Sequence, residues 1–175
     1  MEATIRDATS ADAPACAALY APYVLDTAVS FETEPPAAEE MARRISDAQE
    51  RHAWLVAEHD GAVAGYAYAG AWRSRAAYNR TAETSIYLAP SATGRGLGSA
   101  LYTALLQRLA QLDFRTAVAG MTLPNPASER LHAGLGFTPV GVFRRVGWKN
   151  GAWQDVSWMQ LNLAGWAGEG TGEAP

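Results

Sequence analysis

The chain has 175 residues, of which 49% are hydrophobic, and its formal net charge is −4. This length suits one domain with a sizeable core, and no apolar run approaches the roughly 18–20 residues that cross a bilayer. The negative charge and the lack of a Lys/Arg stripe argue against nucleic acid as a partner. A single cysteine, Cys16, excludes an internal disulfide and favours a reducing compartment, so we expect a cytoplasmic protein.

The first half of the chain alternates β-rich runs with helical patterns. In order, these are a strand at 3–9, a helix at 15–25, an extended segment at 28–36, a polar amphipathic helix at 37–52 and a hairpin at 53–71. Pro22 is expected to end or kink the first helix, because its ring removes a backbone donor. The arms of the hairpin meet at Asp60-Gly61, a dipeptide that favours a tight turn.

The second half predicts strand, loop, helix, strand, helix and hairpin. The segments are a strand from 81 that Pro90 stops, a glycine loop and helix at 93–112, an apolar strand at 116–122, a helix at 125–137 and a hairpin at 138–163 with its turn at Asn150-Gly151. Leu101, Leu105 and Leu109 give the first of these helices one apolar face. Asn125 is a good N-cap for the second, and Pro126 suits its first position.

The glycines Gly94, Gly96 and Gly98 stand at alternate positions directly before a helix. Glycine allows positive φ and a close backbone approach, and a helix N-terminus offers free N–H groups to a phosphate. Arg95 would add a charge-assisted contact. The spacing matches neither the P-loop nor the dinucleotide G-x-G-x-x-G pattern. From these residues alone, a phosphate-binding loop and a flexible turn remain equally open.

Several segments together resemble the GNAT superfamily of N-acetyltransferases. The stretch IYLAPSATGRGLGSALYTALL resembles its acetyl-CoA loop, with Gly96 and Gly98 on the glycines of the Arg/Gln-x-x-Gly-x-Gly/Ala signature and Thr93 where the family usually has Arg or Gln. NPASERLHAGLGF is similar to a second family signature. VSFETEPP, WLVAEHDGAVAGYAYAGAWRSRAAYNR and GWKNGAWQDVSWMQL narrow the resemblance to the phosphinothricin/methionine sulfoximine acetyltransferase group, and the likeness covers roughly residues 3–163.

This resemblance implies a single GNAT domain at residues 1–163, followed by a glycine-rich tail at 164–175 that we expect to be disordered. The implied fold is a mixed α/β fold whose central twisted mixed sheet has about seven strands, flanked by about four helices, with two strands splayed at the acetyl-CoA site. The implied activity is acetyl-CoA-dependent acetylation of the α-amino group of phosphinothricin, methionine sulfoximine or methionine sulfone, by direct transfer in a ternary complex. Family members are commonly homodimers.

For acetyl-CoA, the resemblance points to one strand, the glycine loop and the start of the later helix. The expected contacts are Ile86, Tyr87, Leu88, Gly94, Arg95, Gly96, Leu97, Gly98, Ser99, Asn125 and Ser128. Asn125 would serve both as N-cap and as a contact to the pantetheine amide. Thr93 lacks the usual side-chain contact to the pyrophosphate but leaves the backbone contacts possible.

Glu83 and His132 are the candidate catalytic residues. Acetyl transfer to an amine needs a base for the amine proton, donors for the oxyanion and an acid for the leaving thiolate. The resemblance places the general base at Glu83, acting directly or through a water; the alternative is an exposed carboxylate paired with an arginine such as Arg80. His132 stands where many GNAT enzymes have a tyrosine as general acid, and the alternative is a packed helix histidine.

The acceptor residues are expected around the acid-free, arginine-rich segment 71–80. The candidates are Phe31, Trp72, Arg73, Arg75, Tyr78, Thr84 and Ser85. The two arginines would clamp the carboxylate and the phosphinyl or sulfoximine oxygens, while the aromatic residues serve equally well as core. The alternatives are another small amine, an amino acid, a polyamine or a protein N-terminus as acceptor, or a non-catalytic acyl-CoA sensor. Dispersed histidines and a packed Cys16 predict neither a metal nor a covalent nucleophile.

Overall fold

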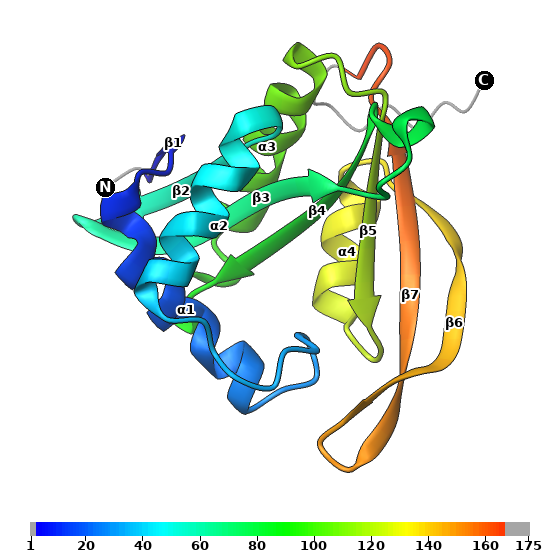
Figure 1. Cartoon of the computed structure of the whole chain (residues 1–175), viewed down its shortest axis with the longest axis horizontal. Coiled ribbons are helices and arrows are strands. Elements are labelled where there is room, and N and C mark those ends of the chain that lie inside the picture. Colours follow the sequence, from blue (N-terminus) through cyan, green and yellow to red (C-terminus); the bar gives the residue numbers. More distant parts are fainter. Residues whose placement is uncertain (1–2, 167–175) are drawn as a thin grey trace.

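The computed structural model describes residues 3–166, which form a seven-stranded sheet with helices on both faces (Figure 1). The elements, with η for a single 3₁₀ turn, are β1 (Thr4–Asp7), η1 (Ser10–Asp12), α1 (Ala13–Leu25), α2 (Ala38–Arg51), β2 (Trp54–His59), β3 (Ala62–Ala71), η2 (Ala76–Tyr78), β4 (Thr81–Leu88), η3 (Pro90–Ala92), α3 (Leu97–Gln111), β5 (Thr116–Thr122), α4 (Pro126–Gly134), β6 (Thr138–Lys149) and β7 (Ala152–Asn162). The strand order is β1-β2-β3-β4-β5-β7-β6. The predicted mixed α/β fold is confirmed.

The region around the first helix differs from the sequence prediction in two places. Pro22 was expected to end or kink the helix, but α1 continues past it to Leu25. At its end, the Asp26 N–H donates to the Pro22 carbonyl at 2.9 Å. A proline in the last turn removes only one donor, so one further turn is tolerated. The segment 28–36 was expected to be extended, but it is a series of bends without a strand partner.

The last described residues, 164–166, return to the core. Residues 164–165 form a turn, and the Trp166 indole Nε1 donates to the Leu135 carbonyl at 3.3 Å while its ring packs against buried residues. The expected disorder therefore does not hold for residues 164–166, because a large aromatic side chain finds apolar surface there. The rest of the predicted tail, 167–175, lies outside the described residues.

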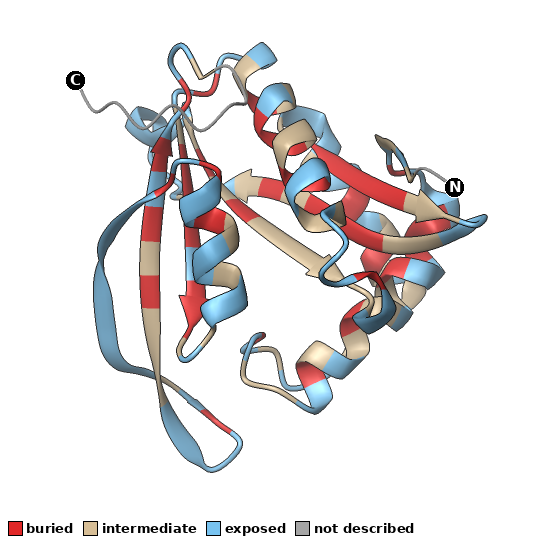
Figure 2. Ribbon diagram, turned by 180° about the vertical axis from the view of Figure 1, so that it is seen from behind, coloured by how far each residue is buried: buried red, intermediate tan, exposed pale blue. Residues whose placement is uncertain are grey.

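The two faces of the sheet carry different side chains. On the face covered by α3, the leucines Leu101, Leu105 and Leu109 are fully buried against small strand residues, mostly alanines. On the other face, aromatic and β-branched strand residues such as Trp54 and Tyr66 pack beneath α1 and α2. Figure 2 shows the resulting pattern, with buried bands alternating along the central strands. Because side chains alternate along a strand, neighbouring residues of one strand serve different cores.

The strands β4 and β5 separate after a short parallel contact. Only Thr81–Glu83 pair with Thr116–Val118, and beyond them the two strands diverge in a V (Figure 1). From Thr84 onward, the edge of β4 that faces β5 has no strand partner for its backbone N–H and C=O groups. The sheet is therefore open in its middle, and backbone groups of β4 without a strand partner line the opening, one of them the Leu88 carbonyl, which accepts from the Tyr23 hydroxyl at 2.7 Å.

Candidate active site

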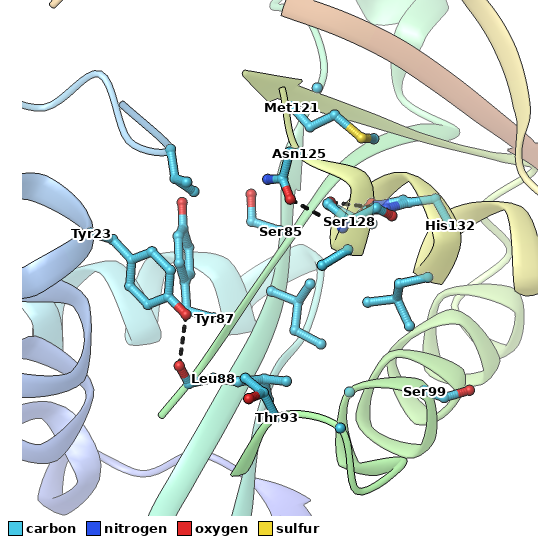
Figure 3. A pocket seen from close by; sticks show the side chains of 18 of the residues that line it. Tyr23, Ser85, Tyr87, Leu88, Thr93, Ser99, Met121, Asn125, Ser128 and His132 are labelled. Atoms are coloured by element: carbon cyan, nitrogen blue, oxygen red, sulfur yellow. Dashed lines mark hydrogen bonds between the residues drawn. The ribbon is translucent and has the colours of Figure 1, made fainter. Parts of the chain in front are cut away.

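A cleft of about 500 Å³ lies in the gap between β4 and β5 (Figure 3). The predicted site residues that line it are Thr84, Ser85, Ile86, Tyr87, Leu88, Gly94, Gly96, Gly98, Ser99, Asn125, Ser128 and His132. They come from β4, from the glycine loop and first turn of α3 that follow closely in the chain, and from α4 with its N-cap, which the chain reaches only after α3 and β5. Two predicted contacts lie elsewhere: Arg95 is exposed on the loop, and Leu97 packs toward the α3 core.

The glycine loop shapes the entrance of this cleft. Gly94 and Gly96 have φ of +73° and +78°, a left-handed conformation that glycine adopts without strain. Gly98 serves another purpose, since a Cβ there would lie 3.0 Å from Leu88 Cδ1, so its lack of a side chain lets α3 start close to β4. The Thr93 hydroxyl donates to the Pro90 carbonyl at 2.9 Å and thus holds the turn. The first turn of α3 presents its free N–H groups to the cleft.

The start of α4 forms the opposite wall. Asn125 caps this helix as predicted, because its Oδ1 accepts a hydrogen bond from the Ser128 N–H at 3.1 Å. The cap leaves the Asn125 side chain at the cleft, beside Met121 and across from Ser85 (Figure 3). Polar groups from two elements therefore flank the gap in the sheet.

A second cavity of about 600 Å³ lies on the α1 and α2 face of the sheet. Four residues line both cavities, so they meet at Val29, Ser85, Tyr87 and Gly120. Of the predicted acceptor and catalytic residues, those that line this second cavity are Phe31, Trp72, Arg73, Glu83 and Ser85. We call it the acceptor pocket.

Several residues of the acceptor pocket were missed by the sequence analysis. They are Tyr20, Val29, Ser30, Glu32, Tyr68, Gly120, Thr122, Phe143, Val146, Val156 and Trp158. Four of them come from β6 and β7, where an apolar strand pattern gives no sign of which side chains will meet a distant loop. The Trp158 ring stacks edge-on against Trp72, with ring centroids 4.7 Å apart, and so closes one side of the pocket.

Three of the residues predicted to bind the acceptor do not line the acceptor pocket. Arg75 and Tyr78 lie exposed on the loop around η2 and line neither cavity in the described part of the chain. Thr84 follows Glu83 on β4 and so points to the opposite face of the sheet, where its Oγ1 lies 3.1 Å from the Val118 carbonyl oxygen. Its hydroxyl therefore belongs to the α3 side and not to the acceptor pocket.

Glu83 is a half-buried carboxylate at the edge of the acceptor pocket. Burial raises its pKa, because removing the carboxylate from water disfavours its charged form, and the positive charge of Arg73 acts in the opposite direction. Arg80, the partner considered from the sequence, pairs with Asp113 instead. Directly across on β3 stands Gly70, which leaves the space beside Glu83 free of a side chain. The carboxylate is therefore available to a ligand in the pocket, directly or through a water.

His132 is buried and takes part in a chain of hydrogen bonds. Its Nδ1 lies 2.7 Å from the Ser128 carbonyl, which only accepts, so Nδ1 carries the proton. Its Nε2 lies 3.0 Å from the hydroxyl of Tyr102, which in turn lies 2.6 Å from Thr84 Oγ1. Burial lowers the pKa of His132, so the imidazole is neutral near pH 7. Tyr102 escaped the sequence analysis, although a tyrosine on a buried helix face signals a polar partner.

The remaining reactive groups do not form a second centre in residues 3–166. Cys16 is fully buried in α1, and burial raises the pKa of its thiol to about 12, so the nucleophilic thiolate does not form near neutral pH. Among the described residues, no three His, Cys, Asp or Glu side chains are grouped as metal ligands would be. Within the same residues, no helix combines the length and apolarity needed to span a membrane.

Comparison with known proteins agrees with this geometry. A model of the family "Acetyltransferase (GNAT) domain" matches residues 5–158. A phosphinothricin N-acetyltransferase of Streptomyces viridochromogenes is 43% identical over 159 residues, which cover 91% of this chain and 87% of the relative. An L-methionine sulfoximine/L-methionine sulfone acetyltransferase of Salmonella typhimurium is 37% identical over 171 residues, which cover 91% of this chain and 94% of the relative. The crystal structure of a phosphinothricin acetyltransferase of Sinorhizobium meliloti in complex with acetyl-CoA matches with a TM-score of 0.89 at 41% identity, covering 100% of this chain and 94% of that one.

The chain therefore belongs to the GNAT superfamily, and it is an acetyltransferase. Within the superfamily, it belongs with the phosphinothricin and methionine sulfoximine acetyltransferases, as the sequence motifs indicated.

Proposed function

We propose that this protein uses acetyl-CoA to acetylate the α-amino group of small amino acids of the phosphinothricin, methionine sulfoximine and methionine sulfone type, by direct transfer in a ternary complex. The observation that carries the proposal is the junction of the two cavities at Val29, Ser85, Tyr87 and Gly120, with Glu83 on the acceptor side. A thioester in one cavity and an amine in the other can meet there without a covalent enzyme intermediate.

The residues of the cleft fit an acyl-CoA. The first turn of α3 supplies unpaired N–H groups where the pyrophosphate would lie, and Gly98 keeps that turn close to β4. The unpaired edge of β4 beyond Glu83 supplies backbone groups for the pantetheine amides. Asn125 and Ser128 complete the wall on the α4 side. Because backbone groups make most of these contacts, the threonine at position 93 is compatible with binding.

The acceptor pocket fits an α-amino acid better than a polycation. Arg73 offers a guanidinium for the α-carboxylate, and it stacks over Trp72 with 4.7 Å from Cζ to the ring centroid. The carboxylate of Glu32 is already bound by Arg44 and Tyr20. Glu83 is thus the carboxylate left for the amine. A polyamine would need further carboxylates, so that alternative is disfavoured.

In the proposed reaction, Glu83 accepts a proton from the α-ammonium group, and the free amine attacks the thioester carbonyl. The raised pKa of Glu83 brings it closer to the pH of the reaction, which improves a general base. A general-acid role for His132 stays a prediction. Its one N–H, at Nδ1, donates to the Ser128 carbonyl, and the buried path from Nε2 through Tyr102 and Thr84 ends at the Val118 carbonyl, which has no proton to supply.

The proposal is tested by an acceptor screen with acetyl-CoA and a thiol-release readout, run on the wild type and on Glu83→Gln. We expect turnover with the three amino acids named above, and a fall in kcat of roughly 10²–10⁴-fold in Glu83→Gln, the usual worth of a general base. Acetyl-CoA binding measured by calorimetry should not change. Glu50→Gln, which neutralises an exposed carboxylate on α2, is the matched control.

The pH profile provides a second readout. Since burial raises the pKa of Glu83, the acidic limb of kcat/KM should lie above the ordinary glutamate value of 4.5, and it should vanish in Glu83→Gln. Turnover retained in Glu83→Gln would contradict the role of the base. Turnover only with other amines would contradict the acceptor class, and acetyl-CoA binding without any turnover in the wild type would indicate a sensor.

The homodimer implied by the family resemblance also stays a prediction. It is supported by large apolar side chains that are exposed on the β6–β7 hairpin, namely Val140, Phe143, Val146, Trp148 and Trp153.

A further inference from the structure

Lys149 is the only lysine of the chain, and its residue is just 7% exposed. It is the last residue of β6, directly before the turn of the β6–β7 hairpin. A buried ammonium is costly unless all of its donors find acceptors, so a lysine in this place requires partners. Nothing in the proposed acetyl transfer accounts for it.

The partners of Lys149 all belong to the end of α1 and the loop that follows. Its Nζ donates to the carbonyls of Val24 at 2.7 Å, of Glu32 at 2.8 Å and of Ser30. An ammonium has three N–H donors, so these carbonyls use all of them. The bonds join residues more than a hundred positions apart in the sequence, and Figure 1 shows the hairpin tip reaching toward this loop.

The loop held in this way is a wall of the acceptor pocket. Ser30, Phe31 and Glu32 line that pocket, and we refer to them as the 30–32 wall. The ring of Phe31 lies directly on Gly147, two residues before Lys149, where a Cβ would overlap the ring. The hairpin therefore contacts the 30–32 wall at two points: Lys149 binds backbone carbonyl oxygens of the wall, and Gly147 packs against the Phe31 ring.

The other supports of the 30–32 wall come from the helices. The Tyr20 hydroxyl lies 2.5 Å from Ser30 Oγ, and Arg44 pairs with Glu32 at 2.7 Å. These contacts fix the wall to α1 and α2, whereas the Lys149 and Gly147 contacts fix it to the β6–β7 hairpin, which carries Phe143, Val146 and Trp158 on the far side of the pocket. The width of the pocket thus depends on the Lys149 contacts.

We infer that Lys149 is a positioning residue for the acceptor amino acid: its ammonium, bound by three backbone carbonyls, holds the 30–32 wall against the β6–β7 hairpin and so sets acceptor affinity. This inference rests on the proposed function, which locates the amino acid in this pocket. The inference goes beyond the proposed function because it assigns control of acceptor affinity to a side chain that lines neither cavity. The cleft for acetyl-CoA shares Val29 with this pocket, but most of its lining comes from β4, the glycine loop and α4, so it should depend on Lys149 far less.

The test compares Lys149→Met and Lys149→Arg with the wild type. Methionine fills a similar volume but leaves three carbonyls unpaired, whereas arginine keeps the charge in a planar fork that fits three convergent carbonyls less well. We expect the acceptor KM to rise about tenfold or more in Lys149→Met and less in Lys149→Arg, with the KM for acetyl-CoA within about twofold. Arg144→Met is the matched control, because it removes a cation of the same strand whose partner, Asp155, lies within the hairpin.

A second variant keeps the inference testable should Lys149→Met fail to fold. Gly147→Ala leaves the lysine in place but displaces Phe31, so it should also raise the acceptor KM and leave the KM for acetyl-CoA unchanged. An acceptor KM that stays within about twofold in the folded variants, or two KM values that rise together, would overturn the inference.

Amide hydrogen exchange separates this inference from the proposed function. Residues 28–33 should exchange faster in Lys149→Met than in the wild type, while the glycine loop exchanges equally in both. If the wild type acetylates none of the amino acids tested, the proposed function fails, and the exchange data still decide whether Lys149 holds the wall. Equal exchange at residues 28–33 would refute that.

Discussion

The replacement Tyr102→Phe isolates the buried hydrogen-bond chain beneath the cleft. Tyr102 is fully buried on α3, and its ring packs against His132 and Phe137. Phenylalanine preserves this packing and removes only the hydroxyl. That hydroxyl lies 3.0 Å from His132 Nε2 and 2.6 Å from Thr84 Oγ1, so two polar atoms are affected.

The loss of the Tyr102 hydroxyl affects the hydrogen bonding of these two atoms differently. Once the Tyr102 hydroxyl is removed, Thr84 can give its own hydroxyl proton to the Val118 carbonyl, whereas His132 Nε2 loses the one partner that the described residues offer it. A buried acceptor left without a donor costs about 1–3 kcal/mol. For a chain of this size, each kcal/mol shifts Tm by about 2–4 °C, so we expect a drop of roughly 2–12 °C.

The assay is reversible urea unfolding followed by tryptophan fluorescence, with thermal unfolding as a second measure. Tyr78→Phe is the control, because that side chain is 41% exposed and its hydroxyl should contribute less than about 0.5 kcal/mol. If Tyr102→Phe is as stable as the control, the Tyr102 hydroxyl does not satisfy His132 Nε2, and the proposed hydrogen-bond chain is refuted. A fall in kcat without a fall in stability would instead favour a direct role in proton transfer.

Two further variants test other parts of the structure. In Gly120→Ala, the new Cβ would meet Trp158 Cζ2 at 2.9 Å, so the Trp158 ring must move and the acceptor KM should rise. The control is Gly134→Ala, whose new Cβ meets nothing within 4 Å and should leave the acceptor KM unchanged. An equal rise of the acceptor KM in both variants would exclude the displaced Trp158 ring as its cause. Asp12→Asn removes the partner of Arg6, whose guanidinium lowers the pKa of the Asp12 carboxyl from 3.8 to about 2. Because the folded pKa lies below the unfolded one, the stabilisation is complete above about pH 5 and disappears as the pH falls through 2. In denaturant unfolding, the free energy of unfolding of Asp12→Asn should lie about 1–2 kcal/mol below that of the wild type at pH 7, and this difference should shrink toward pH 2. A difference that does not depend on pH would rule out the ion pair as its cause.

Local signals in the sequence were sufficient for most elements. Asp60-Gly61 and Asn150-Gly151 both adopt positive φ at the hairpin turns, because these residue types tolerate that conformation in any context. The Asn125 cap depends on atoms three residues apart, so it too was visible in the sequence. The motif resemblance located the cleft residues of β4, the glycine loop and α4 for the same reason: each motif is a continuous stretch.

Contacts between distant strands could not be read in this way. The sequence pointed to Glu83 and Thr84 as neighbours in one site, but the alternation of β4 sends them to opposite faces of the sheet. Trp158 and Lys149 lie in a strand pair whose pattern predicts only a hairpin, and their roles depend on where the 28–36 loop comes to rest. The sequence by itself thus determined the elements, the family and the glycine loop of the cleft, since these depend on residues close together in the chain. The tertiary structure alone decided the shape of the acceptor pocket, because its walls come from segments that meet only when the sheet forms.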